Sequence, residues 1–309
     1  MFVGHGLQLI MGWDKKLGMW NRVMIGYVLF IVCALIILLQ QAFDTSANTG
    51  ATLVLISFGM VGATNTLTEA AFYALSALFP DSSFTTAIQI GNGTSGVINI
   101  TLNTIIRLLV GGTNPAKDDA QRINSVSFYI FFSVLIVVCL VAIRNCPPRR
   151  LHESWGEHLG RLYRITCVIM VPFVAQFIIF LCSLTVFPGI GCSSGFQYAA
   201  GASWANWYCS PGVIATYNYG DFFGRLLAPI LLTRIDLKWC FGLSWLRWAF
   251  LILLLIGMPG SDPVTFASPT NSLFAFGNAA GFGQFWQLFM YVLVGLTNGV
   301  LSTITFALG

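Results

Sequence analysis

The sequence predicts an all-α polytopic membrane protein, and three observations support that prediction. Of the 309 residues, 56% are hydrophobic and only 8% are charged, whereas soluble domains carry charge on about 25% of their residues. Apolar windows long enough to cross about 30 Å of hydrocarbon as helices recur about eight times. Basic residues gather on one side if these windows alternate in direction. The windows are 23–43, 52–80, 85–111, 125–143, 163–188, 208–234, 240–258 and 284–308.

The basic residues indicate the orientation of the chain. One side carries Lys15, Lys16, Arg22, Arg144, Arg149, Arg150, Arg161, Arg164, Arg234 and Lys238. The other side carries Lys117, Arg122 and, at the end of a window, Arg107. By the positive-inside rule the first group is cytosolic, so orientation explains the net charge of +4. We expect a multi-pass protein of the lipid bilayer, at the plasma membrane, with no nucleic-acid partner.

A basic connector separates the first four windows from the last four. Pro147 and Pro148 prevent a helix from continuing through it. We therefore expect the remainder of an N-terminal helical bundle at 1–143, a cytosolic connector at 144–162 and a C-terminal helical bundle at 163–309. The opening segment "MFVGHGLQLIMG" is too short to span a membrane, and the chain stops at "TITFALG" without a polar tail. These two features predict that helices are missing from both ends.

A loop without charge, 187–209, is expected to face outward. It contains Cys192 and Cys209, which either pair in an oxidising compartment or remain free thiols. The other cysteines lie mostly in or beside the apolar windows, where cysteine is typical as a small packing residue.

The stretch "TYNYGDFFGRLLAPI" (216–230) concentrates polarity on one helix face. At 100° per residue, Asn218, Asp221 and Arg225 lie within about 60° of one another, and Pro229 falls on the same side. Proline removes one backbone hydrogen bond, which is tolerable in a membrane beside a wet cavity. The face is therefore expected to point into the protein.

Three other windows contain similar polar stripes. The third window has Gln89, Asn92, Gly96, Asn99, Asn103 and Arg107 within about 80°. The second has Asn65, Glu69, Phe72 and Ser76, and the last has Gln284, Gln287, Tyr291, Asn298 and Ser302. Four helices with such faces predict a shared polar interior.

Each stripe has a structural alternative. Amides and hydroxyls hold helices together by hydrogen bonds of about 1 kcal/mol. A charge at the bilayer centre costs at least about 2.5–3.5 kcal/mol and usually lines a pathway or is paired. Asp221 and Arg225 are either a structural (i, i+4) ion pair or a pair that contacts a polar substrate. Both alternatives remain open from the residues alone.

No feature of the sequence indicates an enzyme, a cofactor or a metal site. The three histidines, His5, His152 and His158, lie near the terminus or in the connector, away from the windows. A catalytic nucleophile therefore lacks a histidine base in any window. The glycines of "GNGTSG" (91–96) are expected to let helices pack closely, because a phosphate loop requires a preceding strand and a following lysine.

The stretch "YNYGDFFGR" (217–225) resembles the Asn-x-x-Asp-x-x-Gly-Arg signature of the equilibrative nucleoside transporter family. Three further stretches are similar in the same order, over nearly the whole chain: "TEAAFYALSALFPDSSFTTAIQIGNGTSG" (68–96), "LTVFPGI" (184–190) and "LVGLTNGVLST" (293–303). The resemblance implies a fold related to the major facilitator superfamily, with eleven helices and a large cytosolic loop after the sixth. This chain then begins near the end of the second helix and stops after the tenth.

The resemblance also implies a substrate site. Its implied substrate-binding residues are Asp221, Arg225, Glu69, Asn92, Asn218, Phe72 and Asn298. Gating or structural roles are expected for Arg22, Gly224, Pro229, Asn99 and Asn103. Glu69 and Asn92 depart from mammalian members, which have glutamine at the first position and Gly-Gln-Gly around the second; the variant is similar to protozoan members.

The expected function is alternating-access transport of purine nucleosides or nucleobases. Protonation of Glu69 or Asp221 would couple that transport to a proton gradient, so protons are a second expected partner. Two alternatives are kept: a non-transporting receptor or scaffold whose intramembrane polar residues are structural, and a channel.

Overall fold

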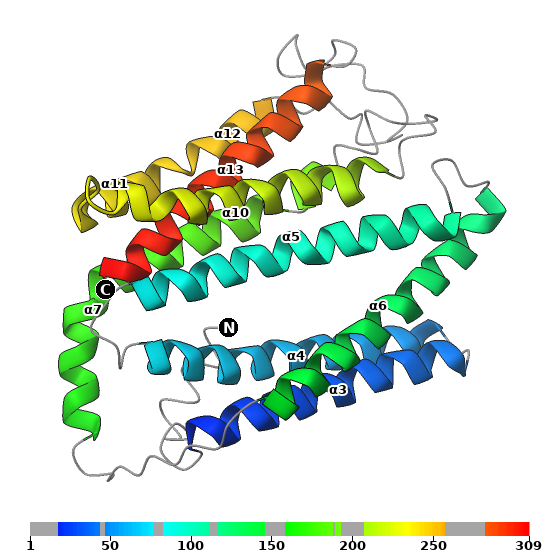
Figure 1. The fold of residues 1–309 in the computed structure, drawn as a ribbon. Coiled ribbons are helices and arrows are strands. Elements are labelled where there is room, and N and C mark those ends of the chain that lie inside the picture. The colour runs from blue at the N-terminus through cyan, green and yellow to red at the C-terminus, as the bar shows by residue number, and fades with distance from the viewer. Residues whose placement is uncertain are drawn as a thin grey trace. The chain divides into compact units, whose positions relative to one another are not determined.

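The computed structural model describes residues 18–43, 47–76, 83–111, 117–145, 158–187, 189–192, 207–256 and 282–308 (Figure 1). All regular structure in these ranges is helical. The longer helices are α3 (Met19–Ala42), α4 (Ala47–Ser76), α5 (Ser83–Gly111), α6 (Lys117–Asn145), α7 (His158–Val186), α10 (Ile214–Leu231) and α13 (Phe282–Leu308). A π-helical segment, Tyr208–Val213, precedes α10, and α11 (Leu237–Leu246) and α12 (Ala249–Ile256) follow it.

The helices confirm an all-α polytopic membrane protein. Within the described ranges, seven helical stretches are long and apolar enough to cross a membrane. The window predicted at 208–234 is also helical, because α10 continues directly from the π-helical segment. The segment predicted at 144–162 as a cytosolic connector and the N-terminal residues 1–17 lie largely or wholly outside the described residues.

The window predicted at 240–258 is one apolar run, but the structure divides it into α11 and α12. The break falls at Arg247 and Trp248. The amides of Trp248, Phe250 and Leu251 donate to carbonyls three residues earlier, so the chain tightens there instead of continuing as an α-helix.

The chain forms two compact units, which are described separately. The first comprises Met1–Pro80 and Ile106–Tyr163, and the second comprises Asp81–Ile105 and Arg164–Gly309. Most of α5 thus belongs with the C-terminal helices. The bundles expected at 1–143 and 163–309 remain a prediction.

In the first unit α3 packs against α4 and α6. A glycine allows the closest approach, because a Cβ at Gly26 would collide with the Thr68 side chain. Arg22 is buried one turn before this contact. At the other end of α3, Gln41 Nε2 lies 3.5 Å from Ser125 Oγ of α6.

In the second unit α10 and α13 lie side by side, as Figure 1 shows. Glycines four residues apart on each helix face the partner's backbone. A Cβ at Gly220 or Gly224 would strike a carbonyl oxygen of α13, and a Cβ at Gly295 or Gly299 would strike one of α10. Paired small-xxx-small patterns of this kind let membrane helices approach closely.

Two apolar clusters lie at different heights along these helices. One contains Val186, Tyr208, Val213, Leu254, Met290, Tyr291 and Val294. The other contains Ile179, Ala228, Cys240, Val300, Leu301 and Ile304. On α7, α10 and α13 the residues between the two clusters include a serine, an aspartate and an asparagine, so a polar layer separates them.

Cys192 and Cys209 form a disulfide. The bond joins the helical residues after α7 to the π-helical segment before α10. The structure therefore selects the paired alternative for these two cysteines. Cys33, Cys139, Cys182 and Cys240 are buried free thiols, as expected for packing residues.

We expect Gly224→Ala to destabilise the second unit, because the added methyl has no room against the Leu296 carbonyl. Overpacking of this kind costs about 1–3 kcal/mol. Gly91→Ala is the matched control, since nothing lies within 4 Å of a Cβ at Gly91. Thermal unfolding of the purified protein in detergent should show a lower midpoint for Gly224→Ala alone. Equal midpoints for the two variants would contradict the close packing.

Candidate functional site

The centre of the polar layer is an ion pair within α10. Arg225 Nε donates to Asp221 Oδ2 at 2.8 Å. Their (i, i+4) spacing places both on the face that the sequence predicts to point inward. Both residues are buried, with exposures of 8% for Asp221 and 6% for Arg225. A charge held in this way inside a spanning helix requires further polar partners to offset its desolvation.

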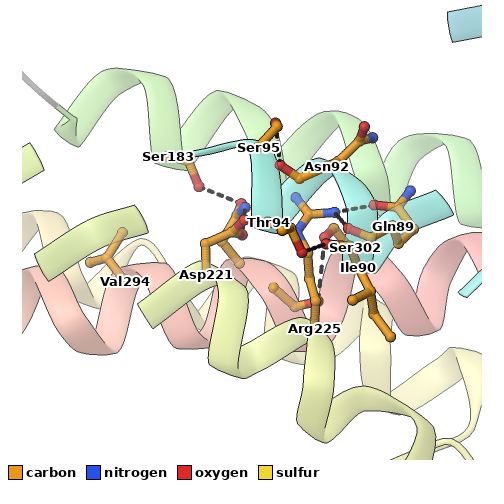
Figure 2. Close-up of polar contacts among 12 residues, drawn as sticks. Gln89, Ile90, Asn92, Thr94, Ser95, Ser183, Asp221, Arg225, Val294 and Ser302 are labelled. Carbon is orange, nitrogen blue, oxygen red and sulfur yellow. Dashed lines mark hydrogen bonds and ion pairs between the residues drawn. The ribbon is translucent and has the colours of Figure 1, made fainter. Parts of the chain in front are cut away.

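Gln89 of α5 supplies acceptors for the arginine (Figure 2). Arg225 Nη1 donates to the backbone carbonyl of Gln89 at 3.1 Å and also to its side-chain oxygen Oε1. Glycine makes this approach possible, because a Cβ at Gly93 would lie 2.7 Å from Arg225 Cδ. The glycines of "GNGTSG" thus divide by role: Gly93 and Gly96 allow α5 to pack on α10, whereas Gly91 faces open space.

Asn298 of α13 satisfies the second oxygen of the carboxylate. Its Nδ2 donates to Asp221 Oδ1 at 2.7 Å. The Ser183 hydroxyl of α7 donates in turn to Asn298 Oδ1 at 2.7 Å. Asp221 therefore receives one donor from its own helix and one from α13, and both donors are held by further contacts.

Arg247 is a second buried arginine of this layer, with an exposure of 2%. Its Nη2 donates to Ser183 Oγ at 2.8 Å, and Ser183 is the residue that holds Asn298. One continuous network of hydrogen bonds joins four helices and the break between α11 and α12. Its members are Arg247, Ser183, Asn298, Asp221, Arg225 and Gln89.

The sequence analysis selected three residues of this hydrogen-bond network as site residues: Asn298, Asp221 and Arg225. It did not select Gln89, Ser183 or Arg247. Gln89 was recognised as part of a polar stripe but was not selected as a site residue. Ser183 carries no signal, because hydroxyls are frequent in membrane helices. Arg247 could have been found, since a charge in the middle of an apolar window indicates function or pairing.

The structure places other predicted residues of the second unit around the ion pair without joining them to it. Asn218 donates from Nδ2 to the Ile214 carbonyl at 2.8 Å and abuts Gly96. Asn92 is exposed, and its side chain points away from Arg225 in Figure 2. Asn99 and Asn103 are also exposed. Their roles stay predictions.

Two predicted positions on α10 serve different purposes. Gly224 is buried against the backbone of α13 and sets the distance between the helices. Pro229 lies inside α10, and its side chain is exposed instead of buried beside Asp221.

Three predicted residues belong to the first unit. Glu69 is half-buried on α4, where Asn65 Nδ2 donates to its Oε2 at 3.4 Å. Phe72, three residues later, has an exposure of 38%. Arg22 is buried on α3. Their participation in one site with Asp221 stays a prediction.

The site offers hydrogen bonds and charge, as a polar ligand requires. Within the described residues, Nη2 of Arg225 donates to no protein group, so two N–H donors remain for a ligand. Each carboxylate oxygen of Asp221 accepts one bond and has a further lone pair. The described residues contain no cluster of three or more His, Cys, Asp or Glu side chains that could hold a metal ion.

Comparison with known proteins shows a distant similarity to a named transporter. No protein-family profile matches the chain. The sequence is 22% identical over 259 residues to a protein of Arabidopsis thaliana named Equilibrative nucleotide transporter 8. The aligned region covers 81% of this chain and 62% of the relative, so the chain spans less than two thirds of that protein. The similarity is thus to a protein named as a transporter, and the spanning helices of this chain are those of a multi-pass membrane protein.

We expect Arg225→Met to destabilise the second unit strongly, because it leaves the buried carboxylate of Asp221 without its counter-charge. Breaking a buried ion pair from one side costs about 3–5 kcal/mol, whereas removing both charges is often neutral. The double variant Asp221→Asn/Arg225→Met should therefore recover most of the lost stability.

The measurement is the thermal unfolding midpoint of the purified protein in detergent. Arg234→Met is the matched control, because Arg234 is exposed just beyond α10, and its midpoint should match that of the parent. A double variant less stable than Arg225→Met alone would contradict an ion pair in the folded protein.

Proposed function

We propose that this protein carries purine nucleosides or nucleobases across a membrane by alternating access. The observation that carries the proposal is the buried pair Asp221–Arg225, which is held in place by Gln89 and Asn298 and keeps donors and acceptors available. Preorganised polar groups of this kind fix the orientation of a small polar ligand in a mostly apolar site. The similarity to a protein named as a nucleotide transporter supports the same class of substrate.

The chemistry of the pair suits a nucleoside or nucleobase. The free Nη2 edge of Arg225 is a donor that matches a ring nitrogen or a carbonyl oxygen of a base. The Asp221 carboxylate accepts from a ribose hydroxyl or a base N–H. We propose that Glu69 and Asn92 read the remaining edge of the base and that Phe72 stacks on its face.

Transport then follows from rocking of two helical bundles about this site. In the proposed arrangement the bundles are 1–143 and 163–309, joined by a cytosolic connector at 144–162. The disulfide Cys192–Cys209 supports an outward position for the segment 187–209, because disulfides persist in oxidising compartments. We further propose that protonation of Glu69 or Asp221 couples uptake to the proton gradient at the plasma membrane.

One observation favours the rival function, a non-transporting receptor or scaffold. Both oxygens of Asp221 and two nitrogens of Arg225 are already bonded within the protein. An ion pair satisfied in this way also serves to hold three helices together. The two functions differ in whether a purine crosses the membrane.

The decisive test is uptake of radiolabelled adenosine and hypoxanthine at two external pH values, in purine-transport-deficient cells that express the full-length protein. We expect saturable uptake of at least one compound, and a larger uptake at the lower pH if a proton is carried inward. Uptake that does not saturate would indicate a channel. No uptake of either compound, with the protein present at the cell surface, would favour the receptor or scaffold.

Asp221→Asn should reduce uptake by roughly tenfold to a hundredfold, because hydrogen bonds to a charged group contribute about 1.5–3 kcal/mol. Asp236→Asn is the matched control, since Asp236 is exposed and its side chain caps no helix. Near-normal uptake by Asp221→Asn at equal surface expression would count against a direct role of this carboxylate in substrate binding.

A further inference from the structure

We propose that Arg247 is a positioning residue that sets the orientation of the Asp221 carboxylate through Ser183 and Asn298. This inference rests on the proposed function, because the oriented carboxylate is taken to be the one that binds substrate. Arg247 itself is buried among protein groups and is not proposed to contact the substrate.

The contacts of Arg247 define its geometry. Nη1 donates to the Ile179 carbonyl at 2.7 Å, and Nη2 donates to Ser183 Oγ at 2.8 Å and to the Val294 carbonyl at 3.1 Å. Nε donates to Thr297 Oγ1 at 3.2 Å. The planar guanidinium thus bridges α7 and α13. On α13 its partners are the residue next to Asn298 and the residue one turn before it.

The interruption between α11 and α12 positions this side chain. The Arg247 carbonyl accepts from Phe250 N, three residues later, at 2.9 Å instead of from the residue four positions later. It also accepts from Cys182 Sγ at 3.4 Å. Both the backbone and the side chain of Arg247 therefore contact α7. A continuous helix would keep its carbonyl for a partner four residues later.

Arg247 controls which way the Ser183 hydroxyl points. That hydroxyl has one hydrogen, and its acceptors include Asn298 Oδ1 at 2.7 Å and the Ile179 carbonyl at 3.0 Å. The Tyr217 hydroxyl also hydrogen-bonds with the Ser183 side chain, and a phenol can donate its own hydrogen to Ser183 Oγ, so this contact does not require the serine hydrogen. Arg247 Nη1 already donates to the Ile179 carbonyl, which also lies within a regular helix. With that acceptor occupied, the Ser183 hydrogen is directed to Asn298.

The direction of that hydrogen fixes the amide of Asn298. An amide presents an acceptor on one side and donors on the other. When Ser183 donates to Oδ1, Nδ2 faces Asp221 Oδ1, where it donates at 2.7 Å. Loss of the Ser183 donor removes one of the two bonds that hold the amide, so Nδ2 is held less firmly against the carboxylate. Arg247 acts on the carboxylate through this two-step relay.

The test compares two variants that each remove one contact of Arg247. Ser183→Ala removes the hydroxyl that links Arg247 Nη2 to Asn298. Thr297→Val removes the hydroxyl bonded to Arg247 Nε, which has no hydrogen bond toward Asp221. With adenosine uptake as the assay, we expect Ser183→Ala to raise KM about three- to tenfold at nearly constant maximal rate, the effect of one hydrogen bond. Thr297→Val should leave KM within about twofold.

A purely structural role of Arg247 predicts a different pattern. Both variants would then lower the thermal midpoint and the amount of active protein equally, and KM would not change. Equal KM values for Ser183→Ala and Thr297→Val would overturn the relay. Arg247→Lys keeps the positive charge but loses the planar, forked set of N–H donors. It should therefore raise KM by about as much as Ser183→Ala does.

Failure of the proposed function is recognised separately, because the parent protein would then take up neither adenosine nor hypoxanthine. In that case the relay is judged by a double-mutant cycle between Ser183→Ala and Asp221→Asn, measured as thermal stability in detergent. Coupled residues give a non-additive change, which would support the relay, whereas additive changes would overturn it.

Discussion

The buried carboxylate of Asp221 is the constraint on which the arrangement of the second unit depends. A charge inside a membrane-spanning helix must find its donors within the protein, because lipid offers none. One donor, Arg225, comes from the same helix, and the other, Asn298, comes from α13. The N–H groups of Arg225 in turn require acceptors, and Gln89 of α5 supplies its backbone and side-chain oxygens. Satisfying one charge thus ties three helices together.

Close backbone approach is the condition for this polar layer. Side chains as short as aspartate and asparagine meet across α10 and α13 only if the two helices nearly touch. Gly220 and Gly224 on one helix and Gly295 and Gly299 on the other remove the side chains that would separate them. The motif residues Gly224 and Arg225 therefore cooperate, since the glycine sets the distance at which the neighbouring charges are paired.

The polar layer lies between two apolar clusters that share α7, α10 and α13. Apolar side chains therefore lie on both sides of the hydrogen-bond network, and its polar groups have few alternative partners nearby. Arg247 is the extreme case, since a guanidinium at 2% exposure has its donors distributed over two backbone carbonyls and two hydroxyls. A rigid shell of this kind suits a site that must recognise a small polar molecule.

Periodicity and composition alone determined the class of protein, the spans and the inward face of α10. The reason is physical: a helix in lipid must be apolar outside, so charged residues such as Asp221 and Arg225 reveal the face that is turned inward. The same reasoning identified Asn298 on its stripe. It could not distinguish Gln89 from Asn92, because both lie on the same polar side of α5 and only the contact with α10 decides which is buried. Ser183 lies on a helix without a polar stripe and Arg247 lies at the break between α11 and α12, and tertiary packing joined both to the network around Asp221. Tertiary packing therefore decided which polar residues became hydrogen-bond partners. A hydrogen bond depends on the distance between helices, and the amino-acid sequence does not specify that distance directly.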